Sequence, residues 1–235
     1  GARPMILGQR IINAILRPLF ALVLPYDVEG AENLPQTGPV VVMINHVNLT
    51  DVVMPGMFLP RDVVMMSKIE NFTAPVLGLF VRAYGAVPLR RGEVDMEAMR
   101  LALQSLRRGE VLVIAPEGTR SEDGRLQQGH DGLAFVASQA AVPVVPFVMY
   151  GHQDWWRNLK HLRRTPLHVR VGKPFRFVAR GRRRRAELRA MTQEAMYRLA
   201  ELLPPEYQGA YAGPEKVTYE LTEPWVPATA TGGEG

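Results

Sequence analysis

The residues best suited to chemistry are His46 and Asp51, which stand five positions apart in the segment 45–51. An imidazole takes up a proton on one ring nitrogen while an acceptor holds the other nitrogen as N–H. A carboxylate is a suitable acceptor, because it fixes the tautomer and stabilises the imidazolium that forms. The pair predicts a general base, His46, oriented by Asp51. The same two residue types also fit a loop histidine beside a capping aspartate.

The spacing of the pair requires a turn between them. Five residues along a helix leave the side chains about 140° apart, and along a strand an odd separation points them to opposite faces. Asn48 and Thr50 favour turns and helix caps, and Pro55 limits the helix that follows. The preceding run, Val40 to Ile44, is uniformly apolar and predicts a strand buried on both faces. Open α/β sheets place their sites at the carboxyl ends of such strands.

Three further segments follow the pair in order along the chain. They are residues 85–91 (Gly-Ala-Val-Pro-Leu-Arg-Arg), 116–121 (Pro-Glu-Gly-Thr-Arg-Ser) and 142–146 (Val-Pro-Val-Val-Pro). Together with His46 and Asp51 they resemble, in order and spacing, the four blocks of the glycerolipid acyltransferase family, in the type that acts on 1-acyl-glycerol-3-phosphate. The resemblance covers roughly residues 26 to 180. The Pro-Glu-Gly-Thr-Arg-Ser segment is the most specific of the four.

The resemblance implies a role for each block. His46 deprotonates the acceptor hydroxyl, Asp51 orients His46, and the segment at 142–143 places its strand and the acyl donor. The glycerol phosphate is bound by Lys68, Arg91, Glu117, Gly118, Thr119 and Arg120. Guanidinium groups and backbone N–H donors suit a phosphate monoester. A carboxylate repels phosphate, so Glu117 also fits the roles of capping a turn or fixing Arg120.

The implied reaction is direct acyl transfer from acyl-CoA or acyl-carrier protein to the free hydroxyl of 1-acyl-glycerol-3-phosphate, which gives phosphatidate. The chain has no cysteine and no Gly-x-Ser-x-Gly motif, which argues against a covalent acyl-enzyme. A thioester is already activated, so we expect neither a cofactor nor a metal. The remaining histidines show no metal-ligand spacing: His130, His152, His161 and His168.

The acceptor is the open part of this prediction. The family often shows Phe-Lys-x-Gly after the Glu-Gly-Thr-Arg segment, whereas this chain has Leu126-Gln127-Gln128-Gly129. The missing lysine leaves another lysophospholipid, an amino-acid lipid or a glycolipid as alternative acceptors. A non-catalytic lipid- or membrane-binding module is a further alternative, and the intact His46 and Asp51 argue against it.

Charge and apolar patterning indicate a membrane surface. The 235 residues carry 28 Lys and Arg against 23 Asp and Glu, a net charge of +5 that suits a polyanionic partner. Residues 180–185 hold five arginines, which fit an anionic membrane or a solvated loop. No nucleic-acid motif accompanies them, so we expect no nucleic acid partner. Trp155 and Trp156 fit an interfacial anchor or a packed core pair.

An N-terminal helix within residues 1–25 is expected to lie in the membrane interface. Its apolar stretch is interrupted by Arg10 and Arg17, while Ile11, Ile15 and Leu19 share one side. The interruptions argue against a spanning helix, and a core-packed helix is the alternative. The sequence therefore predicts a peripheral or monotopic protein at the cytoplasmic face of a membrane.

Apolar strands alternate with amphipathic helices between residues 26 and 204, which predicts the acyltransferase domain. Strands are expected at 26–30, 40–44, 63–66, 85–89, 111–115, 144–150 and 167–171, and helices at 76–84, 96–109, 133–141 and 188–202. The fold class is α/β, a single domain with a central mixed sheet flanked by helices. Residues 205–235, rich in Pro, Gly, Thr and Glu, predict an irregular tail.

Overall fold

The protein is built around one mixed β-sheet. The computed structural model describes residues 7–89, 96–178 and 184–226. Within these residues the sheet has nine strands, in the order β1-β7-β6-β2-β5-β3-β4, with β8 and β9 extending from β6. The strands are β1 (Tyr26–Glu29), β2 (Val40–Ile44), β3 (Val63–Lys68), β4 (Val87–Leu89), β5 (Val111–Ile114), β6 (Val144–Tyr150), β7 (Leu167–Val171), β8 (Phe175–Phe177) and β9 (Thr222–Pro224).

Five neighbouring strands run in the same direction. β6, β2, β5, β3 and β4 pair in parallel, whereas β7 and β8 are antiparallel to β6. The carboxyl ends of the five parallel strands therefore share one edge of the sheet. The described segments that follow β2, β3, β5 and β6 begin at that edge, as expected for a ligand site in an open α/β sheet.

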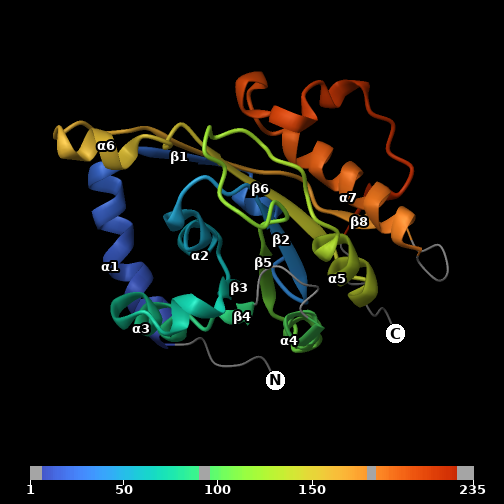
Figure 1. Cartoon of the computed structure of the whole chain (residues 1–235), viewed down its shortest axis with the longest axis horizontal. Coiled ribbons are helices and arrows are strands. Elements are labelled where there is room, and N and C mark those ends of the chain that lie inside the picture. Colours follow the sequence, from blue (N-terminus) through green and yellow to red (C-terminus); the bar gives the residue numbers. More distant parts are fainter. Residues whose placement is uncertain (1–6, 90–95, 179–183, 227–235) are drawn as a thin grey trace, which may run out of the picture.

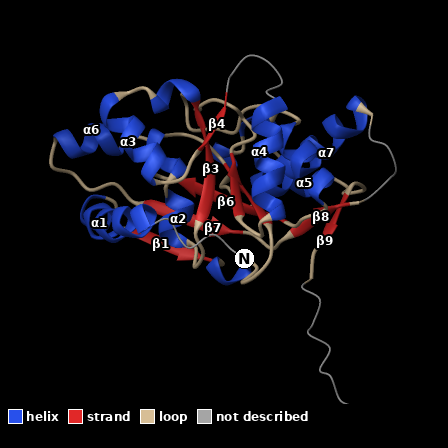
Figure 2. Ribbon diagram, turned by 90° about the horizontal axis from the view of Figure 1, so that it is seen from below, coloured by secondary structure: helices blue, strands red, loops and turns tan. Residues whose placement is uncertain are grey.

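Helices cover both faces of the sheet (Figures 1 and 2). They are α1 (Leu7–Val23), α2 (Met54–Phe58), α3 (Pro75–Ala83), α4 (Met96–Arg107), α5 (Gly132–Ala140), α6 (Trp155–Lys160) and α7 (Arg185–Ala200). On β2, Val41 and Met43 pack with α4, α5 and α7. Val42 and Ile44 face the other way, toward α1 and α2. Each strand residue is buried on one side or the other, which explains why β2 is apolar throughout.

Helix α1 reverses the usual arrangement of an amphipathic helix. Its buried positions are polar: Gln9 bonds both backbone groups of Val63, and Asn13 bonds Gly56 and Tyr84. Ile12, Leu16 and Phe20 pack partly against the core. An apolar ridge, the α1 ridge, is 51–71% exposed; it consists of Leu7, Ile11, Ile15, Leu19 and Leu22. α1 thus packs on the domain through polar contacts and still presents apolar side chains outward.

The predicted fold class, a single α/β domain with a central mixed sheet flanked by helices, is confirmed. Patterning did not reveal α2, α6, β8 or β9, which are only three to six residues long. No helix in the part of the chain that the structure describes is long and apolar enough to cross a membrane.

The segment after Pro204 differs from the irregular tail that composition predicts. Over residues 205–226 it forms three 3₁₀ turns and strand β9. The ring of Tyr211 is buried, and its hydroxyl accepts a hydrogen bond from the Gly129 N–H at 3.0 Å. The backbone of Leu126 bonds Tyr207 and Ala210. These contacts secure residues 126–129, and they could not be seen in composition because they depend on tertiary packing.

The polar attachment of α1 gives a stability prediction. Asn13→Ala removes the side chain that donates to the Gly56 carbonyl at 2.8 Å, leaving a buried acceptor unsatisfied. The free energy of unfolding should fall by about 2 kcal/mol, measured by urea denaturation. Ile15→Ala, on the exposed side of the same helix, should change it by less than about 0.5 kcal/mol. Equal losses in the two variants would contradict this packing of α1.

Candidate active site

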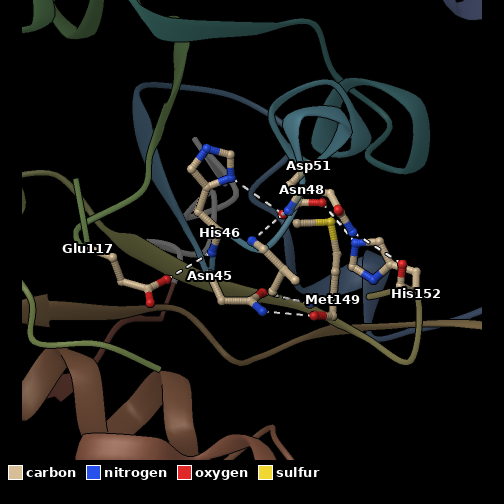
Figure 3. A network of polar contacts seen from close by, with 8 residues as sticks. Asn45, His46, Asn48, Asp51, Glu117, Met149 and His152 are labelled. Carbon is tan, nitrogen blue, oxygen red and sulfur yellow. Dashed lines mark hydrogen bonds and ion pairs between the residues drawn. The ribbon is translucent and has the colours of Figure 1, made fainter. Parts of the chain in front are cut away.

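His46 stands at the carboxyl end of β2, at the edge where the parallel strands end (Figure 3). The residue before it, Asn45, is buried and continues the pairing of β2 with β6 through its side chain. Its amide nitrogen donates to the Met149 carbonyl and its amide oxygen accepts from the Met149 N–H, both at 2.8 Å. The backbone carbonyl of His46 accepts from Ser121 N–H at 2.8 Å. These bonds fix the backbone that carries the imidazole.

Asp51 closes the turn that the spacing requires. Its Oδ2 accepts the backbone N–H groups of Val47 at 2.5 Å and Asn48 at 2.6 Å. Asn48 is the N-cap of a 3₁₀ helix, Leu49–Val52, and Pro55 lies in the first turn of α2. The predicted turn is therefore present, and the carboxylate that orients the histidine also holds the loop together.

The turn brings the imidazole and the carboxylate together. Nδ1 of His46 lies 3.4 Å from Oδ2 of Asp51. An ionised carboxylate only accepts hydrogen bonds, so this contact assigns the proton of neutral His46 to Nδ1. Nε2 is then the basic nitrogen, and the side chain retains slight exposure to solvent. Contacts of this length are common before substrate binds and tighten in the reacting complex.

Asp51 has a second histidine as a partner. Nε2 of His152, in the loop after β6, lies 2.8 Å from Oδ1 of Asp51, and neither side chain is exposed. Burial by itself raises the pKa of Asp51, but the hydrogen bonds of His152 and His46 outweigh it and lower the pKa to about 2. Asp51 is therefore a carboxylate throughout the physiological pH range.

Glu117 is buried, and its carboxyl group connects two loops by hydrogen bonds. One oxygen accepts the backbone N–H of His46 at 2.9 Å, and the other accepts that of Gln127 at 2.8 Å. Burial, opposed by these two donors, raises the pKa of Glu117 to about 7, and the charges of Asp51 and Asp123 add to the rise. With both oxygens occupied by backbone groups, the geometry favours a positioning role over phosphate contact.

The next three residues differ from Glu117 because they are exposed. Gly118, Thr119 and Arg120 lie in the loop that follows β5, beside His46 at the shared edge. Gly118 has φ +68°, and a Cβ there would lie 2.9 Å from the His130 ring, so glycine is favoured by both backbone and space. The loop thus presents a backbone turn and a guanidinium to solvent next to the base.

Of the other predicted binding residues, Lys68 lies farther along the same edge, and Arg91 is not among the residues that the structure describes. Lys68 ends β3, the strand beside β5, and is half-buried. Arg91 lies outside the described residues; it follows β4, which pairs with β3. The Val142-Pro143 segment precedes β6 and therefore lies at the opposite edge from His46. It places its strand: the Pro143 carbonyl accepts from Val41 N–H at 3.0 Å.

Sequence reasoning missed Asn45 and His152 as parts of the site. His152 is 101 residues from Asp51, so no local spacing could reveal their contact. The available signal was the position of His152, which lies two residues after a predicted strand, just as His46 does. Polar residues at the carboxyl ends of neighbouring parallel strands meet at one edge.

The fold and this site define a class of protein. A histidine held by a buried carboxylate at the carboxyl edge of a mostly parallel sheet has one ring nitrogen fixed and the other free, which is the geometry that general-base chemistry on a hydroxyl requires. The family model for acyltransferases matches residues 25–150, more than half of the chain. The chain belongs to the acyltransferase family, which confirms the resemblance predicted from the four segments.

Two curated relatives have different acceptors in their names. A chloroplastic 1-acyl-sn-glycerol-3-phosphate acyltransferase of Brassica napus is 33% identical over 128 residues, 53% of this chain and 37% of that protein. A lyso-ornithine lipid O-acyltransferase of Pseudomonas aeruginosa is 32% identical over 155 residues, 66% of this chain and 58% of that protein. The chain thus spans between about a third and six tenths of the length of these relatives.

A solved structure shares the fold. The crystal structure of the 1-acyl-sn-glycerophosphate acyltransferase PlsC from Thermotoga maritima has a TM-score of 0.60 and 25% sequence identity to this chain. The match covers 80% of this chain and 76% of that one. This structural similarity covers more of the chain than residues 25–150, which the family model matches.

The buried carboxyl of Glu117 predicts that the stability of the fold depends on pH. Folding raises the pKa of the Glu117 carboxyl from an ordinary 4.5 to about 7. Such a group stabilises the folded state fully below pH 4.5, and this stabilisation is lost as the pH rises through about 7. Between pH 5 and 8 the wild type should lose roughly 2 kcal/mol relative to Glu117→Gln, which cannot ionise. Urea unfolding at both pH values measures this difference.

Asp51 does not contribute to that change, because its lowered pKa confines its effect to pH below about 4. Glu122→Gln, at an exposed position in the same loop, should keep the wild-type pH dependence. Parallel stability curves for the wild type and Glu117→Gln would show that Glu117 is ionised throughout.

Proposed function

We propose that this protein transfers an acyl group from acyl-CoA or acyl-carrier protein to the free hydroxyl of 1-acyl-glycerol-3-phosphate. The observation that carries the proposal is the His46–Asp51 pair, fixed at the sheet edge beside the exposed Gly118–Arg120 loop. Family membership supports acyl transfer, and the names of the relatives support a lysophosphatidate acceptor.

In the proposed mechanism, Nε2 of His46 takes the proton of the acceptor hydroxyl as its oxygen attacks the thioester carbonyl. The tetrahedral intermediate carries its charge on the former carbonyl oxygen, where N–H or guanidinium donors stabilise it. Collapse breaks the carbon–sulfur bond, and the imidazolium gives its proton to the thiolate. The products are the diacyl lipid and the free thiol carrier. Asp51 stabilises the imidazolium in between.

The acceptor phosphate is proposed to bind along the same edge. Arg120 and the exposed backbone of the Gly118–Thr119 turn follow β5, and Lys68 ends the adjacent β3. Arg91, which the family resemblance also assigns to the phosphate, lies outside the described residues. Successive cationic groups at the ends of adjacent strands suit an anionic headgroup. Glu117 acts within this arrangement by holding the loops rather than by touching the phosphate.

A lyso-ornithine lipid, an amino-acid lipid, is the second candidate acceptor. The Pseudomonas relative carries that substrate in its name, at a similar identity to the Brassica enzyme. Gln127 stands where the family often has lysine, and its Nε2 is buried without a partner among the described residues. An acceptor that lacks a phosphate depends less on a cation at this position.

We further propose that the protein binds a membrane surface through the α1 ridge. Arg164 donates to the carbonyls of Ala21 and Leu22, which ties the segment after α6 to the end of α1. Trp156 on α6 and Leu162 just after it are exposed, whereas Trp155 packs on Phe20. Figure 1 shows α1, α3 and α6 at the same end of the molecule. Apolar side chains flanked by arginines suit an anionic interface, and we place it at the cytoplasmic face.

The proposed reaction predicts the outcome of removing the base. His46→Ala should lower acyl transfer by about 10²–10⁴-fold or more, and Asp51→Asn should also lower it strongly because the tautomer is no longer fixed. Mass spectrometry of products formed from mixed acyl thioesters and mixed lysolipids measures both the rate and the acceptor. Circular dichroism shows that the variants are folded.

His161→Ala, at an exposed position after α6, serves as the matched control and should retain wild-type activity. Near-wild-type transfer by folded His46→Ala would rule out the mechanism. Preferred acylation of lyso-ornithine lipid over lysophosphatidate would select the second candidate.

The proposed membrane surface predicts a change in vesicle binding. Ile15→Glu places a charge in the middle of the α1 ridge and should weaken co-sedimentation with vesicles containing anionic lipid by about tenfold. Gln104→Glu adds the same charge at an exposed position of α4, which packs on the other face of the sheet, and should leave binding nearly unchanged. Equal losses in both variants would indicate that net charge alone controls association.

A further inference from the structure

His152 occupies a position that the proposed mechanism does not use. It follows β6 after Gly151 and is completely buried. Its Nε2 lies 2.8 Å from Asp51, closer than the 3.4 Å that separates His46 from the same carboxylate. Its backbone carbonyl accepts from the Asn48 side chain at 3.2 Å, so the loop after β6 holds the turn between His46 and Asp51 from two sides.

The protonation of His152 follows from its contacts. Asp51 accepts only, so Nε2 of His152 carries a proton. Nδ1 is buried and has no hydrogen-bond partner among the residues that the structure describes. A second proton there would be a buried donor without an acceptor, which is costly. His152 is therefore built as a neutral donor and does not serve as a base.

The two oxygens of the Asp51 carboxylate have different partners. Oδ1 is occupied by His152, while Oδ2 receives Val47, Asn48 and His46. Held at Oδ1 as well as at Oδ2, the carboxylate resists rotation about its Cβ–Cγ bond, which keeps Oδ2 directed at Nδ1 of His46. The titratable groups around Asp51 are His46 on its own loop, His152 after β6, and Glu117 after β5, which the Asp51 charge reaches.

We propose that His152 is a positioning residue that holds Asp51, and through Asp51 the reactive tautomer of His46, for the acyl transfer proposed above. The inference rests on that function for its kinetic consequence, but the state of the His46 ring can be measured without any substrate. His152 makes no contact with the reacting atoms and acts only through the carboxylate.

The test compares a variant that keeps the donor with one that removes it. In His152→Gln, the amide nitrogen reaches about as far along the side chain as Nε2 does, whereas His152→Leu keeps an apolar volume without a donor. The Leu variant should lose about tenfold or more in kcat, with KM nearly unchanged. The Gln variant should recover most of that loss.

The pH profile provides a readout that a purely structural role would not change. Without the His152 donor, Oδ2 of Asp51 is no longer held toward Nδ1 of His46, so the carboxylate stabilises the His46 imidazolium less. The acidic limb of log(kcat/KM) against pH should therefore move to lower pH in His152→Leu and stay in place in His152→Gln. Nitrogen NMR of the His46 ring should show the proton on Nδ1 in the wild type and the Gln variant, and a tautomer mixture in the Leu variant.

A matched control is present at the exposed edge of the sheet. His168 also pairs with a carboxylate, Nδ1 to Oδ1 of Asp27 at 2.5 Å, so His168→Leu removes a comparable histidine–carboxylate contact. It should change neither the pH profile nor the His46 signals. If His152→Leu does not fold, His152→Asn replaces it, because the shorter amide does not reach Asp51.

A folded donor-free variant with wild-type kcat, pH profile and His46 tautomer would overturn the inference. Absence of acyl transfer by the wild-type protein with every acceptor would instead contradict the proposed function. In that case the NMR comparison still decides whether His152 fixes the tautomer of His46.

Discussion

The buried charge of Asp51 is the constraint on which the site depends. An ionised carboxylate without solvent access costs several kcal/mol unless donors surround it. Here its own loop supplies two backbone N–H groups, and His46 and His152 supply ring contacts from the ends of β2 and β6. Those two strands must be adjacent and parallel for both rings to arrive at one edge. The order of the central strands is therefore also a condition for the chemistry, because any other neighbour of β2 would leave Oδ1 of Asp51 without this donor.

A second buried carboxylate, Glu117, shows how the environment separates two chemically similar groups. Asp51 has four donors and a pKa lowered to about 2, whereas Glu117 has two and a pKa raised to about 7. The charge on Asp51 itself contributes to the rise at Glu117. Environments that shift the pKa values of two neighbouring acids in opposite directions are characteristic of catalytic sites. The permanent charge of Asp51 lies beside the His46 imidazole, where it would stabilise a positive charge, and Glu117, whose pKa lies near neutrality, lies behind the backbone of His46. Both groups hold His46, one through its ring and the other through its main-chain N–H.

Much of this arrangement follows from local sequence, and the remainder depends on contacts between distant segments. The apolar run Val40–Ile44 is long enough to identify a doubly buried strand, and Asn48 is a sufficient turn signal to bring His46 and Asp51 together. The alternation of strands and helices predicts an α/β domain with a central mixed sheet, but it does not give the order or direction of the strands. The role of Gln9 and Asn13 could not, because a helix is ordinarily expected to bury its apolar side, and only tertiary contacts show that Val63 and Gly56 require polar partners. His152 was missed for the same reason: its significance arises from strand adjacency.

Under the proposed function, the division between buried and exposed residues separates the residues that hold the base from those that would contact the acceptor. Asn45, Asp51, Glu117 and His152 are buried and bonded within the protein, so they fix the base regardless of which hydroxyl is presented. Gly118, Thr119 and Arg120 are exposed, and Lys68 is half-buried, so substitutions there cost the fold little, and under the proposed function they would alter acceptor binding. A family built in this way can change its acceptor by changing the exposed edge while keeping the buried network. That relatives with different acceptors in their names resemble this chain at nearly equal identity agrees with such a division. The acceptor should accordingly be sought in the loop from Gly118 to Gln127, and the chemistry in the contacts of Asp51.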